Sequence, residues 1–187
     1  MDSQKVVITK NKIKNAFFQI YEDKKLEKIS IKEITDLANL NRGTFYVYYK
    51  DIYDLLEKIE NEYFEEIKKR ADFIISALIS GDEIKIPDFK FLQKNKKYIK
   101  ILLGKSGSLM NYKIKTLAKN ILKEKVSYTD KDKGTKLDYV LEYIASAQIG
   151  LIIYWIQNDL EFPIEDLILL VRKVSLNGPI TYVKQLN

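Results

Sequence analysis

The chain has no cysteine and no histidine among its 187 residues. Their absence excludes thiol nucleophiles, Cys/His metal sites and imidazole acid–base catalysis. The sequence also shows no pair of carboxylates at a plausible site for acid–base catalysis, so an enzyme is the weakest of the functional hypotheses. No metal or cofactor is predicted. Sustained strand alternation is also absent, which predicts an all-α fold.

Long apolar runs are lacking as well. The most apolar ones, Ile149–Ile156 and Leu167–Val171, are too short to span a bilayer. Residues 1–20 contain no apolar core of the signal-peptide type. We therefore expect a soluble, cytoplasmic protein with no membrane partner.

The composition that remains is globular and basic. Apolar residues make up 46% and charged residues 31% of the chain, whose formal net charge is +6. Residues 1–50 hold ten Lys/Arg against six Asp/Glu, so the excess positive charge lies mostly there. Basic charge of this kind suits a nucleic-acid partner, although lysine-rich composition alone can produce it.

The segment Ser30–Tyr49 predicts two short helices joined by a tight turn. Ser30 and Glu33 have the spacing of a capping box at the start of the first helix. Asn39 stands at the turn, and asparagine tolerates a left-handed backbone. Asn41 is a second N-cap, followed by a helix from Arg42. This arrangement predicts a helix-turn-helix, whose second helix enters the DNA major groove.

The second of these helices carries polar groups suited to DNA. One guanidinium and three hydroxyls can reach phosphates or base edges: Arg42, Thr44, Tyr46 and Tyr48. Gly43 suggests that something approaches the backbone closely, whereas Phe45 and Tyr49 are expected to face the core. The competing reading is an aromatic-rich corner of a core without any partner. Lys10, Lys12 and Lys14 in the preceding helix can face either phosphates or solvent.

These residues carry a family resemblance. Ile34, Ala38, the run Arg42–Tyr46, Tyr49 and a helix restart at Asp51 through Leu56 resemble the DNA-binding domain of the TetR/AcrR regulators. This sequence departs from the family pattern at two positions. Asn39 stands where the family prefers glycine. Ile52 stands where the family often has a lysine, and Lys50 is a candidate to make that lysine's phosphate contact instead. The DNA-binding residues that motif and resemblance together predict are Ser30, Lys32, Arg42, Gly43, Thr44, Tyr46, Tyr48 and Lys50.

The rest of the chain predicts a helical body. We expect a DNA-binding domain over residues 7–67 and an effector-binding and dimerisation domain over residues 68–187. Residues 1–8 are expected to be a frayed arm before a first helix at about 10–21. Further helices are predicted over about 51–80, 88–93, 95–103, 109–126, 135–157 and 163–176. Residues 81–87 are expected to form a linker. Two motif fragments are rejected: Gly104–Ser108 lacks the phosphate-loop spacing, and the loop 127–134 lacks the closing calcium ligand.

The last two helices are predicted to join two copies. Ser146 and Gly150 are four residues apart, which lets another backbone come close. The predicted interface consists of Ser146, Ile149, Gly150, Ile153, Tyr154, Leu167, Leu170 and Val171. The alternative is an ordinary internal core. The resemblance implies dimerisation through these helices, and a homodimer suits an operator with repeated half-sites.

The middle of the chain is the predicted effector chamber. Four tyrosines and one glutamine are candidates to line an amphipathic pocket: Tyr98, Tyr112, Tyr139, Tyr143 and Gln148. The alternative for each tyrosine is a position in the core with its hydroxyl at the rim. The resemblance implies a repressor that a small-molecule effector releases from a double-stranded DNA operator. A second hypothesis is a helical co-activator acting through a protein or a protein-bound ligand.

Overall fold

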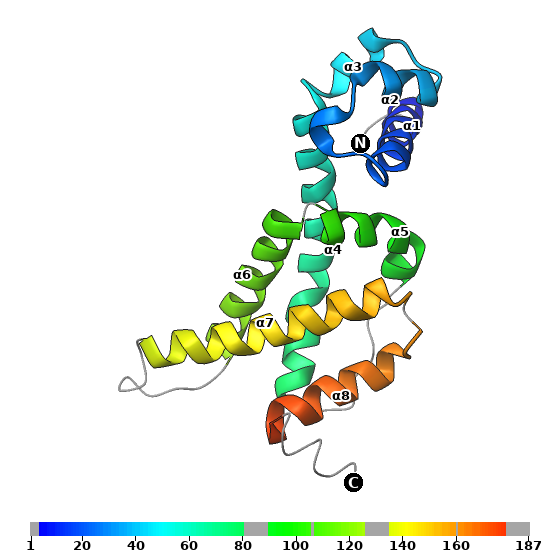
Figure 1. The fold of residues 1–187 in the computed structure, drawn as a ribbon. Coiled ribbons are helices and arrows are strands. Elements are labelled where there is room, and N and C mark those ends of the chain that lie inside the picture. Colours follow the sequence, from blue (N-terminus) through cyan, green and yellow to red (C-terminus); the bar gives the residue numbers. More distant parts are fainter. Residues whose placement is uncertain (1–3, 81–89, 106, 126–134, 160, 179–187) are drawn as a thin grey trace. The chain divides into compact units, whose positions relative to one another are not determined.

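The computed structural model describes residues 4–80, 90–105, 107–125, 135–159 and 161–178. Within these ranges the chain forms α-helices, one 3-10 turn and no strand, which confirms the all-α prediction. The elements in order are α1 Gln4–Tyr21, η1 Leu26–Lys28, α2 Ile31–Ala38, α3 Arg42–Tyr48, α4 Ile52–Ser80, α5 Lys90–Lys105, α6 Gly107–Lys125, α7 Thr135–Gln157 and α8 Ile164–Asn177 (Figure 1).

The chain divides into two compact units, Met1–Tyr63 and Phe64–Asn187. The sequence placed a domain boundary between residues 67 and 68. Helix α4 starts in the first unit and continues without interruption into the second, as the absence of glycine and proline predicts. Its N-terminus is capped by Asp51, whose Oδ1 accepts hydrogen bonds of 2.8 Å from the backbone N–H groups of Tyr53 and Asp54.

An aromatic core holds the first unit together. Phe17 and Phe18 of α1 are fully buried, as is Phe45 of α3. Phe17 stacks on Tyr21 with ring centres 5.0 Å apart, and Phe18 meets Tyr63 edge-on at 6.4 Å. Complete burial of one such side chain contributes about 1.5–3 kcal/mol. Phe45 anchors one side of α3 in this core, and the opposite side of the helix is exposed.

Helix α1 is longer than predicted. Residues 4–8 were expected to be a frayed arm, but they form the first turns of α1. Val7 and Ile8 remain about half exposed, so burial does not hold these turns in place. Once a helix has formed, each residue added to its end forms one further backbone hydrogen bond, so lengthening the helix is easier than starting it. Residues 4–8 contain no glycine or proline that would end the helix.

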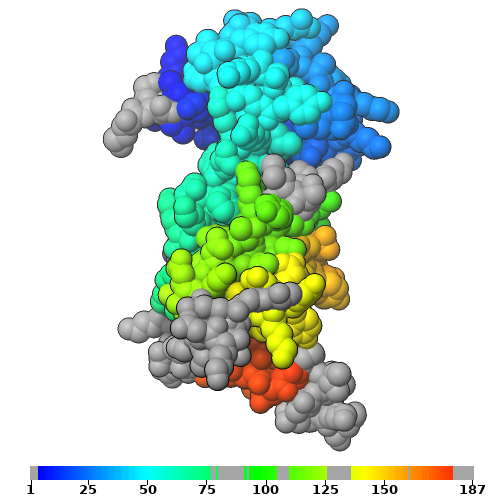
Figure 2. Space-filling model, turned by 90° about the vertical axis from the view of Figure 1, so that its left-hand side faces the viewer, coloured from blue at the N-terminus to red at the C-terminus, as the bar shows by residue number. Residues whose placement is uncertain are grey.

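In the second unit, α5 packs on α6 and α7, and α6 packs on α7. Figure 2 shows α6 and α7 lying side by side on one face of this unit. A buried aliphatic cluster joins them to α4: Ile75, Ala118, Ile121, Leu122, Leu141 and Ala145. On the surface, Glu142 binds Lys115 and Lys119 at 2.6 and 2.8 Å, and these hydrogen bonds lower the pKa of the Glu142 carboxyl to about 2.

The prediction of two short helices over 88–93 and 95–103 is wrong, because α5 is one helix. The side chain of Asn95 donates a 2.9 Å hydrogen bond back to the Phe91 carbonyl instead of capping a new helix. The predicted 104–108 loop is also wrong in its described part, because Gly104 and Lys105 belong to α5 and Gly107 and Ser108 belong to α6; residue 106 lies outside the described residues. The predicted linker 81–87 and the loop 127–134, with its rejected calcium motif, lie outside the described residues.

Candidate functional site

The capping box predicted at the start of α2 is present. Ser30 Oγ accepts a hydrogen bond from the Glu33 backbone at 3.2 Å, and Glu33 Oε2 accepts one from the Ser30 backbone at 3.0 Å. A hydrogen bond from Lys24, followed by those from Ser30, lowers the pKa of the Glu33 carboxyl to about 2. The stabilisation from this depressed pKa is therefore present above the ordinary carboxyl range and is lost as the pH falls toward 2.

The turn between α2 and α3 has the predicted left-handed residue. Asn39 adopts φ 54° and ψ 52°, and its N–H donates to the carbonyls of Thr35 and Asp36. The N–H of Leu40 also reaches the Thr35 carbonyl, at 2.9 Å. Asparagine thus closes the turn without glycine. Asn41 then caps α3 through Oδ1, which accepts from the Thr44 backbone at 2.8 Å.

Helix α3 has a buried side and an exposed side. Phe45 and Tyr49 are buried, which confirms their predicted orientation. On the other side Arg42 is exposed, and Tyr46 is 57% and Val47 73% exposed. Large apolar surface of this kind on a well-anchored helix is available to a partner. The arrangement can place a guanidinium, a phenol and an isopropyl group in a groove.

Gly43 has a free surface around it. Among the described residues, a Cβ atom built at this position would meet one neighbouring group within 4 Å, the Oδ1 of Asn41 at 3.3 Å. Core packing therefore does not require glycine here. That Oδ1 holds the α3 cap and also accepts a 2.9 Å hydrogen bond from the Thr44 hydroxyl. Added bulk would press on this cap and would project from the exposed side of the helix.

The remaining predicted contacts lie at the start of α2, within α3 and just after it. Ser30, Lys32 and Lys50 are exposed, whereas Thr44 and Tyr48 are half-buried. Ile52, which replaces the family lysine, is buried with 9% of its surface exposed. That position therefore faces the core in this chain and offers no cation.

Two lysines lie next to α3: Lys58, which the sequence did not suggest as a contact, and Lys10, for which it left phosphate and solvent open. Lys58 Nζ donates to the Tyr48 carbonyl and to Asp54 Oδ2, each at 2.9 Å, and this lysine lowers the pKa of the Asp54 carboxyl. Lys10 Nζ lies 5.8 Å from the centre of the Tyr48 ring. The four-residue spacing of Asp54 and Lys58 was a readable signal for their pairing, although not for the contact with α3.

Lys14 makes contacts within the first unit. Its Nζ binds Glu62 at 2.8 Å and lies 5.7 Å from the centre of the Tyr63 ring, so it joins α1 to α4. Of the three lysines at the start of α1 that can face either DNA or solvent, Lys14 is thus engaged in an internal contact, while Lys12 is exposed.

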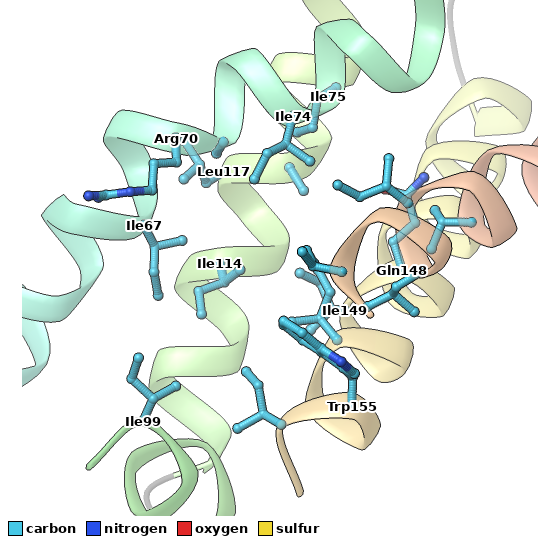
Figure 3. A pocket seen from close by; sticks show the side chains of 18 of the residues that line it. Ile67, Arg70, Ile74, Ile75, Ile99, Ile114, Leu117, Gln148, Ile149 and Trp155 are labelled. Carbon is cyan, nitrogen blue, oxygen red and sulfur yellow. The ribbon is translucent and has the colours of Figure 1, made fainter. Parts of the chain in front are cut away.

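The second unit contains a cavity of about 160 Å³ whose described walls come from α4, α5, α6, α7 and α8. Figure 3 shows side chains from several helices converging on it, among them Ile67, Ile114 and Trp155. All of its described lining residues are apolar except Glu66, Arg70 and Gln148.

The predicted tyrosine-lined chamber does not match this cavity. Of the five predicted residues, Gln148 lines it. Tyr112, Tyr139 and Tyr143 are 62%, 73% and 61% exposed, and Tyr98 is half-buried without lining the cavity. The exposure of Tyr112, Tyr139 and Tyr143 keeps their hydroxyls accessible to water, while aliphatic side chains line the cavity.

The predicted dimer residues fall on two sides of the protomer. Ser146, Gly150 and Tyr154 are exposed, and Ile153 and Leu170 are half-buried. The other three residues are buried and line the cavity: Ile149, Leu167 and Val171. Helix α7 also contains a stretch, Lys136–Gln157, that is long and apolar enough to cross a membrane by length and composition, and 22% of its most apolar window is buried. One such helix is weak evidence for a membrane span.

Comparison with known proteins agrees with this geometry. A family model described as a transcriptional regulator C-terminal region, of the TetR type, matches residues 83–177. The uncharacterized HTH-type transcriptional regulator YxbF of Bacillus subtilis (strain 168) is 20% identical over 157 residues, or 79% of this chain. The chain spans only 39% of the length of that curated relative.

Two solved structures share the fold. The dihydroxyacetone kinase operon activator DhaS matches with a TM-score of 0.56 at 19% identity, over 91% of this chain and 95% of that one. The fatty acid degradation regulator FadR from Bacillus halodurans matches with a TM-score of 0.55 at 18% identity, over 91% and 96%. With the family model covering half of the sequence, the chain belongs to the TetR family of DNA-binding transcriptional regulators.

Proposed function

We propose that this protein is a cytoplasmic repressor that holds operator DNA through α2 and α3 and releases it when a small molecule occupies the cavity of the second unit. The observation that carries the proposal is the exposed side of α3, with Arg42 and Tyr46 on a helix anchored by buried Phe45. The same chain holds an apolar cavity against the far part of α4. The protein thus has both a DNA-facing surface and a place for an effector.

Each exposed side chain of the helix-turn-helix has a distinct role in this proposal. Arg42 reads a guanine edge or clamps a phosphate, and Tyr46 donates its hydroxyl to a phosphate. Gly43 lets the sugar–phosphate backbone approach α3 closely. Lys32 and Lys50 neutralise phosphates on either side, and their contribution falls as salt rises. Ser30 at the N-terminus of α2 and the half-buried Thr44 and Tyr48 make the remaining contacts with the DNA backbone.

We further propose that two copies join through the outward side of α7 with α8. The exposed residues Ser146, Gly150 and Tyr154 mark this side, and the half-buried Ile153 and Leu170 border it. Its apolar stretch is covered poorly within the protomer, which supports a protein partner. A two-fold dimer presents two α3 helices to half-sites about one helical turn, or 34 Å, apart.

Helix α4 is the proposed transmitter between cavity and DNA. Six of its residues that lie in the second unit line the cavity: Glu66, Ile67, Arg70, Ala71, Ile74 and Ile75. A tilt of a few degrees over the roughly 45 Å of this helix moves its other end by a few ångströms. Such a shift spoils the spacing of two recognition helices. The effector needs a differential affinity typical of allosteric coupling, about 1–3 kcal/mol.

A second candidate function is activation. DhaS, whose fold this chain shares, is named as an operon activator, and the chain covers only part of YxbF. In that case DNA binding would require or recruit another protein, in place of release by a small molecule.

The test combines DNA binding and transcription. Purified protein is titrated onto DNA from the region upstream of its own gene, and a reporter on that DNA is measured with and without the protein. Binding by the protein alone, with lower reporter output, supports repression. Higher output, or binding only when a second protein is added, refutes repression and supports activation.

A further inference from the structure

The walls of the cavity decide what kind of molecule it can hold. Its described lining is aliphatic and aromatic apart from three residues, so a ligand inside finds little to hydrogen-bond with. Burying a charged group without a counter-charge costs far more than burying a hydrocarbon. The character of the ligand therefore depends on what those three residues offer.

Two of the three, Glu66 and Arg70, are already committed to one another. Arg70 Nη1 lies 2.9 Å from Glu66 Oε2 and also donates to the Glu66 carbonyl at 2.6 Å. Its guanidinium stands 5.2 Å from the centre of the Phe91 ring. Figure 3 shows this side chain directed away from Ile149 and Trp155. Hydrogen bonds from Lys69 and Arg70 lower the pKa of the Glu66 carboxyl, so the pair stays ionised at neutral pH.

The third polar residue, Gln148, is uncharged and half-buried, and it can offer one amide to a ligand. The indole N–H of Trp155, which also lines the cavity, donates at 2.7 Å to the Phe162 carbonyl. The described lining thus provides one neutral hydrogen-bonding group and no unpaired charge.

We infer that the cavity binds a small uncharged hydrocarbon-like molecule, of the size of one aromatic ring with a short substituent and with at most one hydrogen-bonding group. The size follows from the volume of about 160 Å³. An apolar protein cavity of about 150 Å³ stays dry and binds benzene. This inference rests on the proposed function only in naming that cavity as the effector site, and it specifies the effector's chemical class.

The chain provides its own reporter for this test. Trp155 is the only tryptophan in the sequence and lines the cavity, so its fluorescence responds to occupancy. The probes are toluene, benzoate and benzylammonium, which share one ring and differ in charge. Titrations without DNA, excited at the red edge of the tryptophan band, are expected to saturate with toluene. Both ions are expected to bind at least about tenfold more weakly.

A pair of variants on α6 locates the binding. Ala118→Phe puts a ring into the cavity and should abolish the toluene signal, whereas Asn120→Phe adds the same ring at an exposed position and should leave it unchanged. Ala71→Leu, which fills the cavity from α4, replaces the first variant if circular dichroism shows that it does not fold.

The outcomes separate the inference from the proposed function. No saturable toluene signal, equal or tighter binding of either ion, or toluene binding that survives cavity filling overturns the inference. Toluene binding that follows the expected pattern supports it, even if operator DNA stays bound in a parallel gel-shift assay. That last result would count against effector release, which is part of the proposed function, and not against the ligand class.

Discussion

Replacing Gly150 by leucine tests the proposed dimer without disturbing the protomer. Gly150 lies on α7 and is exposed, and within the described part of the chain no neighbouring heavy atom lies within 4 Å of where its Cβ would stand. A leucine there meets open space in a single chain. Glycine is about 0.5–1 kcal/mol less favourable in a helix than a good helix former, so the isolated protomer should become slightly more stable.

In a dimer packed through this surface, the same leucine has no room. Overpacking a close interface costs about 1–3 kcal/mol, and two-fold symmetry places the change in the interface twice. The dimer should therefore weaken by about 2 kcal/mol or more, which is at least about a 30-fold rise in the dissociation constant. Operator binding should weaken with it, because both half-sites are then no longer occupied together.

The assay is sedimentation velocity over a concentration series, with thermal unfolding measured on the same samples. Gly104→Leu is the matched control, because Gly104 is also an exposed helical glycine with no neighbour within 4 Å of its Cβ. The expected result is a monomer for Gly150→Leu and a dimer for Gly104→Leu and the wild type. A monomeric wild type, or unchanged dimerisation of Gly150→Leu, would refute the reasoning.

Three further predictions concern the DNA-binding surface and its coupling. Arg42→Ala and Tyr46→Ala should each weaken operator binding by about 1–3 kcal/mol, and Arg42→Ala should also flatten the salt dependence by about one ion if the lost contact is to a phosphate; unchanged affinity of both variants in gel shifts at several salt concentrations excludes this surface. A Gly-Gly pair in place of Lys68 and Lys69 should leave effector binding intact but uncouple it from DNA release; release equal to wild type would show that α4 is not the transmitter. Asn39→Ala should lower the free energy of unfolding by about 1 kcal/mol, because alanine is strained at φ 54°, whereas Asn39→Gly should not, and equal urea midpoints for both would contradict the argument.

Local signals in the sequence were sufficient for the helix-turn-helix. The capping box at Ser30, the left-handed Asn39 and the cap at Asn41 depend on residues three or four positions apart, so short-range chemistry specifies them. The length of α4 followed from the absence of glycine and proline, and its start followed from Asp51. The family followed from the same segment, because its motif is local.

Contacts between segments far apart in the chain were beyond that kind of reasoning. Lys58 donates a hydrogen bond to the carbonyl of Tyr48, which is ten residues away in the sequence. Lys10 lies near the Tyr48 ring although the two residues are 38 positions apart. No spacing rule relates such residues, because their distance depends on how α1, α3 and α4 pack around the aromatic core. Only the folded structure shows that both cations border α3.

Local chemistry in the sequence specified the helix-turn-helix, its cap residues, the exposed groups of α3 and the family, but not the bounds of α1 or the continuity of α5. Which side of α7 and α8 faces inward depends on how these helices pack against the rest of the second unit. Both helices carry apolar residues around much of their circumference, so periodicity does not tell an interior stripe from an outer one. Ile149, Leu167 and Val171 line the cavity that α4 also lines, whereas Gly150 and the exposed tyrosines lie outside it. Burial favours the aliphatic side chains because removing them from water lowers the free energy, while a tyrosine hydroxyl loses hydrogen bonds with water when it is buried.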